Sequence, residues 1–159
     1  MTSTSTPRAG LNRLLNSLAA LALLLVVAGG ATAQSGRTIF VDSDGGDNNN
    51  NGQNASISAG VNGPVRTIAR AVELAAGDAS GNVISVEAGN YDINDVDIAA
   101  NANLANLTFQ ARPVAGDNRV RFNITDGNEF ETSAAGLTFA SAQGSNAQFV
   151  LQGGGDVDF

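Results

Sequence analysis

The sequence predicts an all-β domain with one short helix in its N-terminal part, preceded by a signal peptide. Three features indicate this class. Residues 1–33 combine arginines with an apolar run and a small-residue stop. Residues 65–76 place apolar side chains at helical spacing. Beyond Gly77, short runs alternate apolar and polar residues and are bounded by Gly, Asn, Asp or Pro, which is typical of strands joined by turns.

Residues 1–33 have the organisation of a secretory signal peptide. Arg8 and Arg13 precede the apolar run "LAALALLLVVAGG", and Ala31-Thr32-Ala33 follows it as a cleavage site. An uncleaved membrane anchor is the alternative, but the uninterrupted apolar run from Leu18 to Ala28 is short beside the ~20 residues that a spanning helix needs. We therefore expect cleavage, and a secreted, extracellular or cell-surface protein that has no membrane contact afterwards.

The remaining chain, residues 34–159, is strongly acidic. It contains all 15 acidic residues and six arginines, so its formal charge is 6 − 15 = −9. Nucleic acids and anionic membranes need a basic patch to replace their counterions, so this composition argues against both as partners. The chain has no Lys, His or Cys, which excludes disulfides, a Cys nucleophile, a His base, a Lys Schiff base and His-based metal sites.

Residues 34–63 are expected to form an entry strand, "RTIFVD", followed by a polar Gly/Asn-rich loop. A loop of that length is either functional or disordered. Asp42, Asp44 and Asp47 could supply the oxygen ligands that calcium prefers, and calcium is the one cofactor the sequence suggests. The spacing does not follow an EF-hand loop, because position five is Gly46 and position twelve is Gln53. The alternative is a loop in which these residues only form turns.

Residues 64–78 are predicted to form one amphipathic helix of about three turns. Its apolar face comprises Val65, Ile68, Ala69, Val72 and Ala76. A proline at position 64 suits the first turn, and a glycine at position 77 suits a left-handed helix end.

The remainder, residues 79–159, is predicted to form strands. Three runs alternate clearly, and their inward-facing residues are expected to be Ile84, Val86 and Ala88, then Leu107, Phe109 and Ala111, then Val120, Phe122 and Ile124. Runs at 136–141 and 148–153 alternate less cleanly.

These runs suggest a repeat. The residues Val86, Phe109, Phe130 and Phe149 are spaced by 23, 21 and 19 positions, with a second strand between successive anchors. Such a period indicates a solenoid, in which each unit buries its apolar face only against its neighbours. An antiparallel sandwich with frequent turns fits the same pattern.

Residues 37–92 resemble the N-terminal end of right-handed parallel β-helix proteins of the pectate lyase-like superfamily. The matching segments are "TIFVDSDGGD", "GPVRTIARAVELAAGD" and "NVISVEAGNYD", the last with Val86, Ala88, Gly89 and Tyr91 in a V-x-A-G-x-Y pattern. The resemblance implies a β-helix with the helix at 64–78 as its cap and coils over 79–159. An open coil end needs such a cover, because its strand edges and apolar core otherwise associate with other chains.

At the other end, "FVLQGGGDVDF" contains no amphipathic helix. We expect either a partner there or a longer protein of which this is the N-terminal piece. An uncapped C-terminal coil would also favour self-association.

The sequence assigns no catalytic residue. Asp92, Asp95 and Asp97 could include a carboxylate pair for work on a glycosidic bond, with solvated turn charges as the alternative. The resemblance implies aspartates in polygalacturonase-like members, and calcium-binding aspartates with a basic residue as proton acceptor in lyase-like members. The expected function is an extracellular or cell-surface module that binds a polysaccharide or a cell-surface protein, or is structural. The alternative is the N-terminal part of a polysaccharide lyase or glycoside hydrolase acting on acidic polysaccharide, which acidic residues gathered on one face of 80–159 would favour.

Overall fold

In the computed structural model the chain divides into two units, Met1–Ala33 and Gln34–Phe159. The structure describes residues 36–94, 96–98 and 101–158, so the predicted signal peptide lies outside the described residues. Within these ranges no helix has the length and apolar character that crossing a membrane requires.

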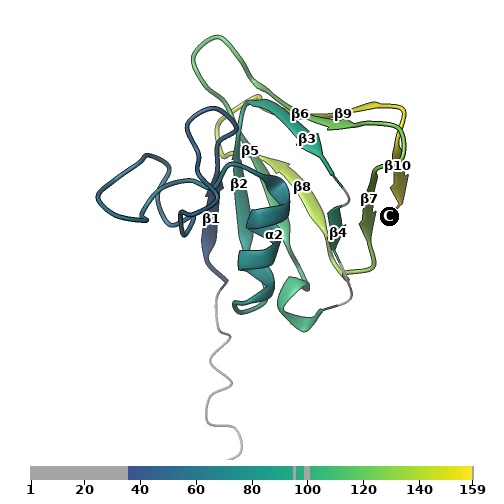
Figure 1. Cartoon of the computed structure of the whole chain (residues 1–159), viewed down its shortest axis with the longest axis horizontal. Helices are drawn as coiled ribbons and strands as arrows, with labels where there is room; N and C mark the ends of the chain where they lie inside the picture. Colours follow the sequence, from purple (N-terminus) through teal and green to yellow (C-terminus); the bar gives the residue numbers. More distant parts are fainter. Residues whose placement is uncertain (1–35, 95, 99–100, 159) are drawn as a thin grey trace, which may run out of the picture. The chain divides into compact units, whose positions relative to one another are not determined.

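The described chain is rich in strands and contains one α-helix, as the all-β class predicts (Figure 1). The elements are β1 (Thr38–Val41), α2 (Ile68–Ala76), β2 (Val83–Glu87), β3 (Gly89–Ile93), β4 (Val96–Ile98), the 3-10 helix η1 (Ala102–Leu104), β5 (Thr108–Arg112), β6 (Arg119–Ile124), β7 (Glu129–Thr132), β8 (Thr138–Ser141), β9 (Gln148–Gly153) and β10 (Asp156–Asp158).

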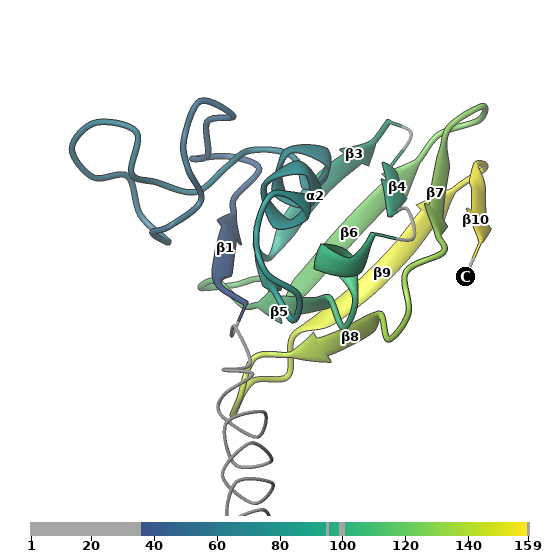
Figure 2. The ribbon, with the colours of Figure 1, turned by 90° about the horizontal axis from the view of Figure 1, so that it is seen from below.

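The strands form three parallel sheets. The first sheet is β1-β2-β5-β8, the second is β3-β6-β9 and the third is β4-β7-β10. Figure 2 shows the strands of the second sheet side by side. From β2 onwards the chain visits the three sheets in the same order three times, so each strand pairs with the strand three places later. The parallel pairing overturns the antiparallel sandwich and is compatible with a β-helix-like fold.

The strand register corrects the predicted repeat. Ile84 lies beside Phe109, and Phe109 lies beside Phe139, which gives steps of 25 and 30 residues with three strands in each. The predicted steps of about twenty residues with two strands were wrong. Val86 and Phe109 share the first sheet but are not register partners, whereas Phe130 and Phe149 lie in the third and second sheets. Phe130, one of the predicted anchors, lies in β7. Strand β10 was missed, because it is short and carries one apolar residue, Val157, between two aspartates.

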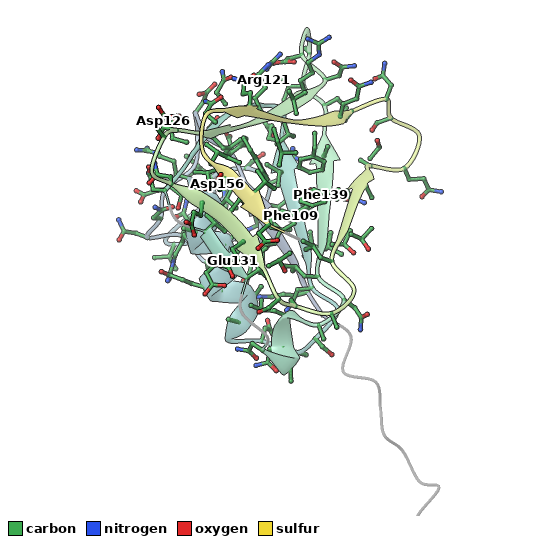
Figure 3. All side chains as sticks on the ribbon, turned by 90° about the vertical axis from the view of Figure 1, so that its right-hand side faces the viewer. Phe109, Arg121, Asp126, Glu131, Phe139 and Asp156 are labelled. Carbon is green, nitrogen blue, oxygen red and sulfur yellow. The ribbon has the colours of Figure 1, made fainter. Side chains whose placement is uncertain are left out.

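The core lies between the three sheets. The alternating residues predicted to face inward in β5 and β6 are buried, and Phe109 and Phe122 are fully so. Phe109 stacks on Phe139 with ring centroids 5.4 Å apart, and Phe122 meets Phe149 edge-on at 5.6 Å. Figure 3 shows Phe109 and Phe139 inside the strands and Arg121 outside them. This aromatic column continues from one set of strands to the next and replaces disulfides as the source of cohesion.

Helix α2 begins three residues later than the predicted apolar stripe. Val65 is not helical, because its N–H donates to the Phe40 carbonyl at 2.9 Å and it forms a parallel bridge with Val41. Thr67 caps the helix instead, and its hydroxyl oxygen accepts a hydrogen bond from the Arg70 N–H at 3.2 Å.

The buried face of α2 consists of Ile68, Ala71, Val72 and Ala75, so the predicted inclusion of Ala69 was wrong. The predicted left-handed end was also wrong, because Gly77 has φ −84° and ψ 0°. The helix contacts β1, β2, β3, β4 and η1. Through these elements it touches strands of all three sheets at the end where the first set of strands begins.

The polar loop, residues 43–64, together with Val65, covers the outer edge of β1. The Phe40 N–H donates to the Gly52 carbonyl at 2.8 Å, and the Asp42 N–H donates to the Val65 carbonyl at 2.9 Å. Inside the loop, the buried Asn50 side chain donates to the Pro64 carbonyl at 2.9 Å. The loop therefore satisfies backbone groups of an edge strand that would otherwise pair with another chain.

Candidate functional site

Three charged residues lie side by side where strands of the first sheet end. Glu87 pairs in register with Arg112, and Asp42 follows directly after Val41, the partner of Val86. Because Val86 points into the core, the alternation of the strand turns Glu87 outward. We call Asp42, Glu87 and Arg112 the carboxylate–arginine row.

Within this row Glu87 and Arg112 form an ion pair, with Nη2 of Arg112 2.6 Å from Oε2 of Glu87. The Arg112 guanidinium also lies over the Phe40 ring, 5.7 Å from its centroid. Burial raises the pKa of the Glu87 carboxyl; Arg112 opposes this shift, and the charges of Asp42 and Asp44 add to it. Sequence reasoning missed Glu87 and Arg112, although each is a charged residue that ends an alternating run.

The three predicted calcium ligands take part in two separate turns. Oδ1 of Asp42 accepts hydrogen bonds from the N–H groups of Asp44 and Gly45, each at 2.9 Å. Oδ1 of Asp47 accepts from the Asn49 N–H at 2.9 Å and from its amide nitrogen at 3.0 Å. Over the ranges that the structure describes, no three acidic side chains are grouped so that they could hold a metal ion. Calcium binding at Asp42, Asp44 and Asp47 stays a prediction of the sequence.

Tyr91 anchors the corner between the first two sheets. Its hydroxyl donates to the Glu87 carbonyl at 2.8 Å, and its ring meets Phe122 edge-on at 6.2 Å. Burial raises the pKa of Tyr91, hydrogen bonds with Ser43 oppose the rise, and the charges of Asp42 and Glu87 add to it. The tyrosine of the V-x-A-G-x-Y pattern thus contacts the backbone of Glu87, a member of the carboxylate–arginine row.

A polar pocket of about 250 Å³ opens beside Tyr91. Its lining consists of Ser43, Arg66, Thr67, Asn90, Tyr91, Asp92 and Asn94. Arg66 is fixed at its rim, because its Nε donates to the Gly46 carbonyl at 2.9 Å. The polar loop, the N-terminus of α2 and strand β3 together build this pocket, and their residues are separated by up to 51 positions in the chain (43 to 94).

From this pocket a line of hydrogen-bonded side chains crosses the second sheet. Asp92, Asn123 and Gln152 lie in register on β3, β6 and β9. Nδ2 of Asn123 donates to Oδ1 of Asp92 at 3.2 Å, and Nε2 of Gln152 donates to Oδ1 of Asn123 at 2.5 Å. We call these three residues the polar ladder.

The predicted acidic group at 92–97 does not lie on one face. Asp92 is on the second sheet and Asp97 on the third, both exposed, while Asp95 lies outside the described residues. Asp97 instead belongs to an acidic face on the third sheet, where it stands in register with Glu131 and Asp158. Glu129 and Asp156 form the adjacent pair of this acidic face.

Comparison with protein families, with curated proteins and with solved structures finds no match to this chain. The fold and the site therefore define it by class: an acidic, strand-rich protein of three parallel sheets, with a polar pocket and a carboxylate–arginine row at the corner of two of them.

Proposed function

We propose that this chain is an exported module of the right-handed parallel β-helix type, similar to the pectate lyase-like superfamily, that binds a glycan or a protein outside the cell. The threefold passage through the same three sheets supports the solenoid, and the contacts of α2 at one end support its role as a cap. The leader-like composition of residues 1–33 supports export.

The observation that best supports a binding function is the gathering of polar and charged side chains around Tyr91, in the carboxylate–arginine row and the polar pocket. Glu87 and Arg112 of the carboxylate–arginine row lie on paired strands. The polar pocket joins strand β3 to the polar loop and to the N-terminus of α2. Polar groups that converge around a pocket and are held by rigid elements are what orients a hydroxyl-rich or peptidic ligand.

The test is binding of the full chain to immobilised glycans and to extracellular protein extracts, compared between wild type and Arg112→Ala. We expect at least one glycan or protein partner whose binding the substitution weakens. The matched control is Arg119→Ala, because Arg119 is exposed and makes no ion pair within the part of the chain that the structure describes. A full chain that binds nothing in either set contradicts the proposal and favours a purely structural role.

A second candidate function is a polysaccharide lyase or glycoside hydrolase that acts on acidic polysaccharide. The raised pKa of Glu87, beside the charges of Asp42 and Asp44, is the property of a carboxyl that donates a proton. The gathering of acidic residues on the third sheet is the pattern that favours this alternative. Incubation with pectin or alginate, followed by assays for unsaturated uronides and for reducing ends, tests it; activity should disappear in Glu87→Gln.

Self-association is proposed through the last set of strands. The outer edges of β8, β9 and β10 pair with no strand among the described residues, and Phe139 and Phe149 are only partly buried there. Sedimentation at increasing concentrations of the full chain tests this, and a constant monomer mass contradicts it.

A further inference from the structure

We infer that the polar pocket and the polar ladder form one binding track for a neutral, hydroxyl-rich glycan, with one sugar unit in the pocket and the following units along the ladder. This rests on the proposed glycan-binding function and adds the ligand class and the site.

The pocket and the ladder are continuous, because Asp92 belongs to both. It lines the pocket and it is the first member of the ladder. Asn90 and Asp92 project outward from β3, while Tyr91 and Ile93 between and beside them are buried. Parallel strands repeat about every 4.8 Å, so Asp92, Asn123 and Gln152 offer polar groups at a regular interval along the coil axis.

The pocket has the size and the lining for a single sugar unit. Its volume of about 250 Å³ lies just below the ~300 Å³ at which pockets for drug-sized ligands begin. Hydroxyls come from Ser43 and Thr67, and amides from Asn90 and Asn94. A sugar hydroxyl both donates and accepts, and the side-chain amides of Asn90 and Asn94 can satisfy it in either role. The Thr67 hydroxyl already accepts from the Arg70 N–H and donates to Oδ1 of Asn48, so it shapes the pocket wall.

Charge selects a neutral glycan over an acidic one. The pocket holds one guanidinium, Arg66, and one carboxylate, Asp92, whose charges balance. Beyond it, the ladder continues with Asn123 and Gln152, which are uncharged, whereas a polymer of uronic acids would need a cation for each unit.

The arginine on the same strand as Asn123 is already paired with a carboxylate. Arg121 lies in register with Asn90, but its Nη1 is 2.7 Å from Oδ2 of Asp117. Their hydrogen bond lowers the pKa of Asp117 and raises the pKa of Arg121, so both stay ionised and paired. The full chain has a formal charge of −7, which repels polyanions in general. The acidic polysaccharide that the resemblance implies therefore does not suit this track.

Calorimetry on the full chain tests the inference. The probes are neutral oligosaccharides of glucose, mannose and xylose, with galacturonate oligomers of the same length as the acidic comparison. We expect binding of a neutral oligosaccharide and no measurable binding of galacturonate. The affinity for the neutral ligand should be the same at low and high salt, because an uncharged ligand forms no ion pair that salt could screen.

The variants Asn90→Ala and Asp92→Asn should each reduce the affinity for the neutral oligosaccharide about five- to tenfold, the usual effect of losing one or two ligand hydrogen bonds. Because Asn has nearly the same size as Asp, a loss of affinity in Asp92→Asn cannot arise from a change in the shape of the pocket. Asn146→Ala is the matched control, since Asn146 is exposed between β8 and β9 and should leave the affinity unchanged.

Binding of galacturonate alone, or neutral binding that Asn90→Ala and Asp92→Asn leave intact, overturns this inference while the glycan-binding function stands. Binding of none of the oligosaccharides overturns the inference and leaves a protein partner as the remaining form of the proposed function.

Discussion

Arg112 and Glu87, on neighbouring parallel strands, form an ion pair of 2.6 Å on the outer face of the first sheet, and the Arg112 guanidinium lies over the ring of Phe40. Both charged side chains are half-buried. Strands β1, β2 and β5 thus each contribute one member of a contact that no single segment could form. The ionisation of Glu87 is correspondingly linked to the folding of the chain.

Glu87→Gln is expected to change how stability depends on pH. Because the pKa of Glu87 is raised above its ordinary value of 4.5, folded wild type retains a proton that the unfolded chain has lost. This stabilisation is fully present below pH 4.5 and is lost as pH rises through the raised pKa. The difference in unfolding free energy, variant minus wild type, should therefore increase with pH across that window. Urea unfolding from acid to neutral pH measures it, and a difference that stays constant would show that Glu87 is not linked to folding.

Val72→Asp should destabilise the protein by about 3 kcal/mol or more, because it places a carboxylate on the buried face of α2. Glu73→Ala, one position further and exposed, is the matched control and should cost less than about 0.5 kcal/mol through its surface pair with Arg70. Thermal unfolding followed by circular dichroism gives both values. Equal effects of the two substitutions would mean that α2 does not cover the sheets.

Asn82→Ala should cost about 2–4 kcal/mol, since the buried Asn82 side chain joins three backbone segments. Its amide donates to the carbonyls of Ala75 at 3.1 Å and Ala79 at 2.5 Å, and its oxygen accepts from the Arg37 N–H at 2.9 Å. Denaturant unfolding measures the cost, with Asn118→Ala as the control. Asn118 is more exposed, so this control gives the cost of removing an asparagine amide that is not part of the buried network. A cost as small as that of the control would contradict its structural role.

Gly46→Ala should destabilise the polar loop by about 1–3 kcal/mol through overpacking. A Cβ at Gly46 would overlap the carbonyl oxygens of Asp42 and Val65. Gly77→Ala is the control, because the nearest atom to its Cβ would be 3.7 Å away. Limited proteolysis within the loop and the unfolding midpoint measure the effect. A Gly46→Ala loop that is as resistant to protease as the wild-type loop would show that the backbone accommodates the Cβ at little cost in free energy.

Removal of calcium is expected to leave the melting temperature unchanged. The carboxylates of Asp42 and Asp47 already accept hydrogen bonds within their turns, so the loop has partners for them without a metal ion. Melts of the full chain with calcium and with a chelator decide this. A midpoint that rises with calcium would establish the calcium site that the sequence suggests and would strengthen the enzymatic alternative.

Local pattern was sufficient for part of this structure. Alternation identified the buried residues of β5 and β6, including Phe109 and Phe122, because a strand beside a core must turn every second side chain inward. The helical stripe located α2, although Val65 was assigned to it wrongly. The backbone of Val65 instead pairs with Val41 of β1. Helical spacing within residues 64–78 cannot reveal a pairing with a distant strand.

The sequence by itself determined that the chain is acidic, lacks cysteine and histidine chemistry, and consists mainly of strands with one amphipathic helix. Only the tertiary structure decided which strands are neighbours, and hence the parallel sheets, the length of the repeat and the meeting of Glu87 with Arg112. The physical reason is that parallel pairing joins strands 25 or more residues apart, and the intervening turns vary in length. The register that brings Asp92, Asn123 and Gln152 into one line is therefore set by packing of the shared core and is absent from any local pattern.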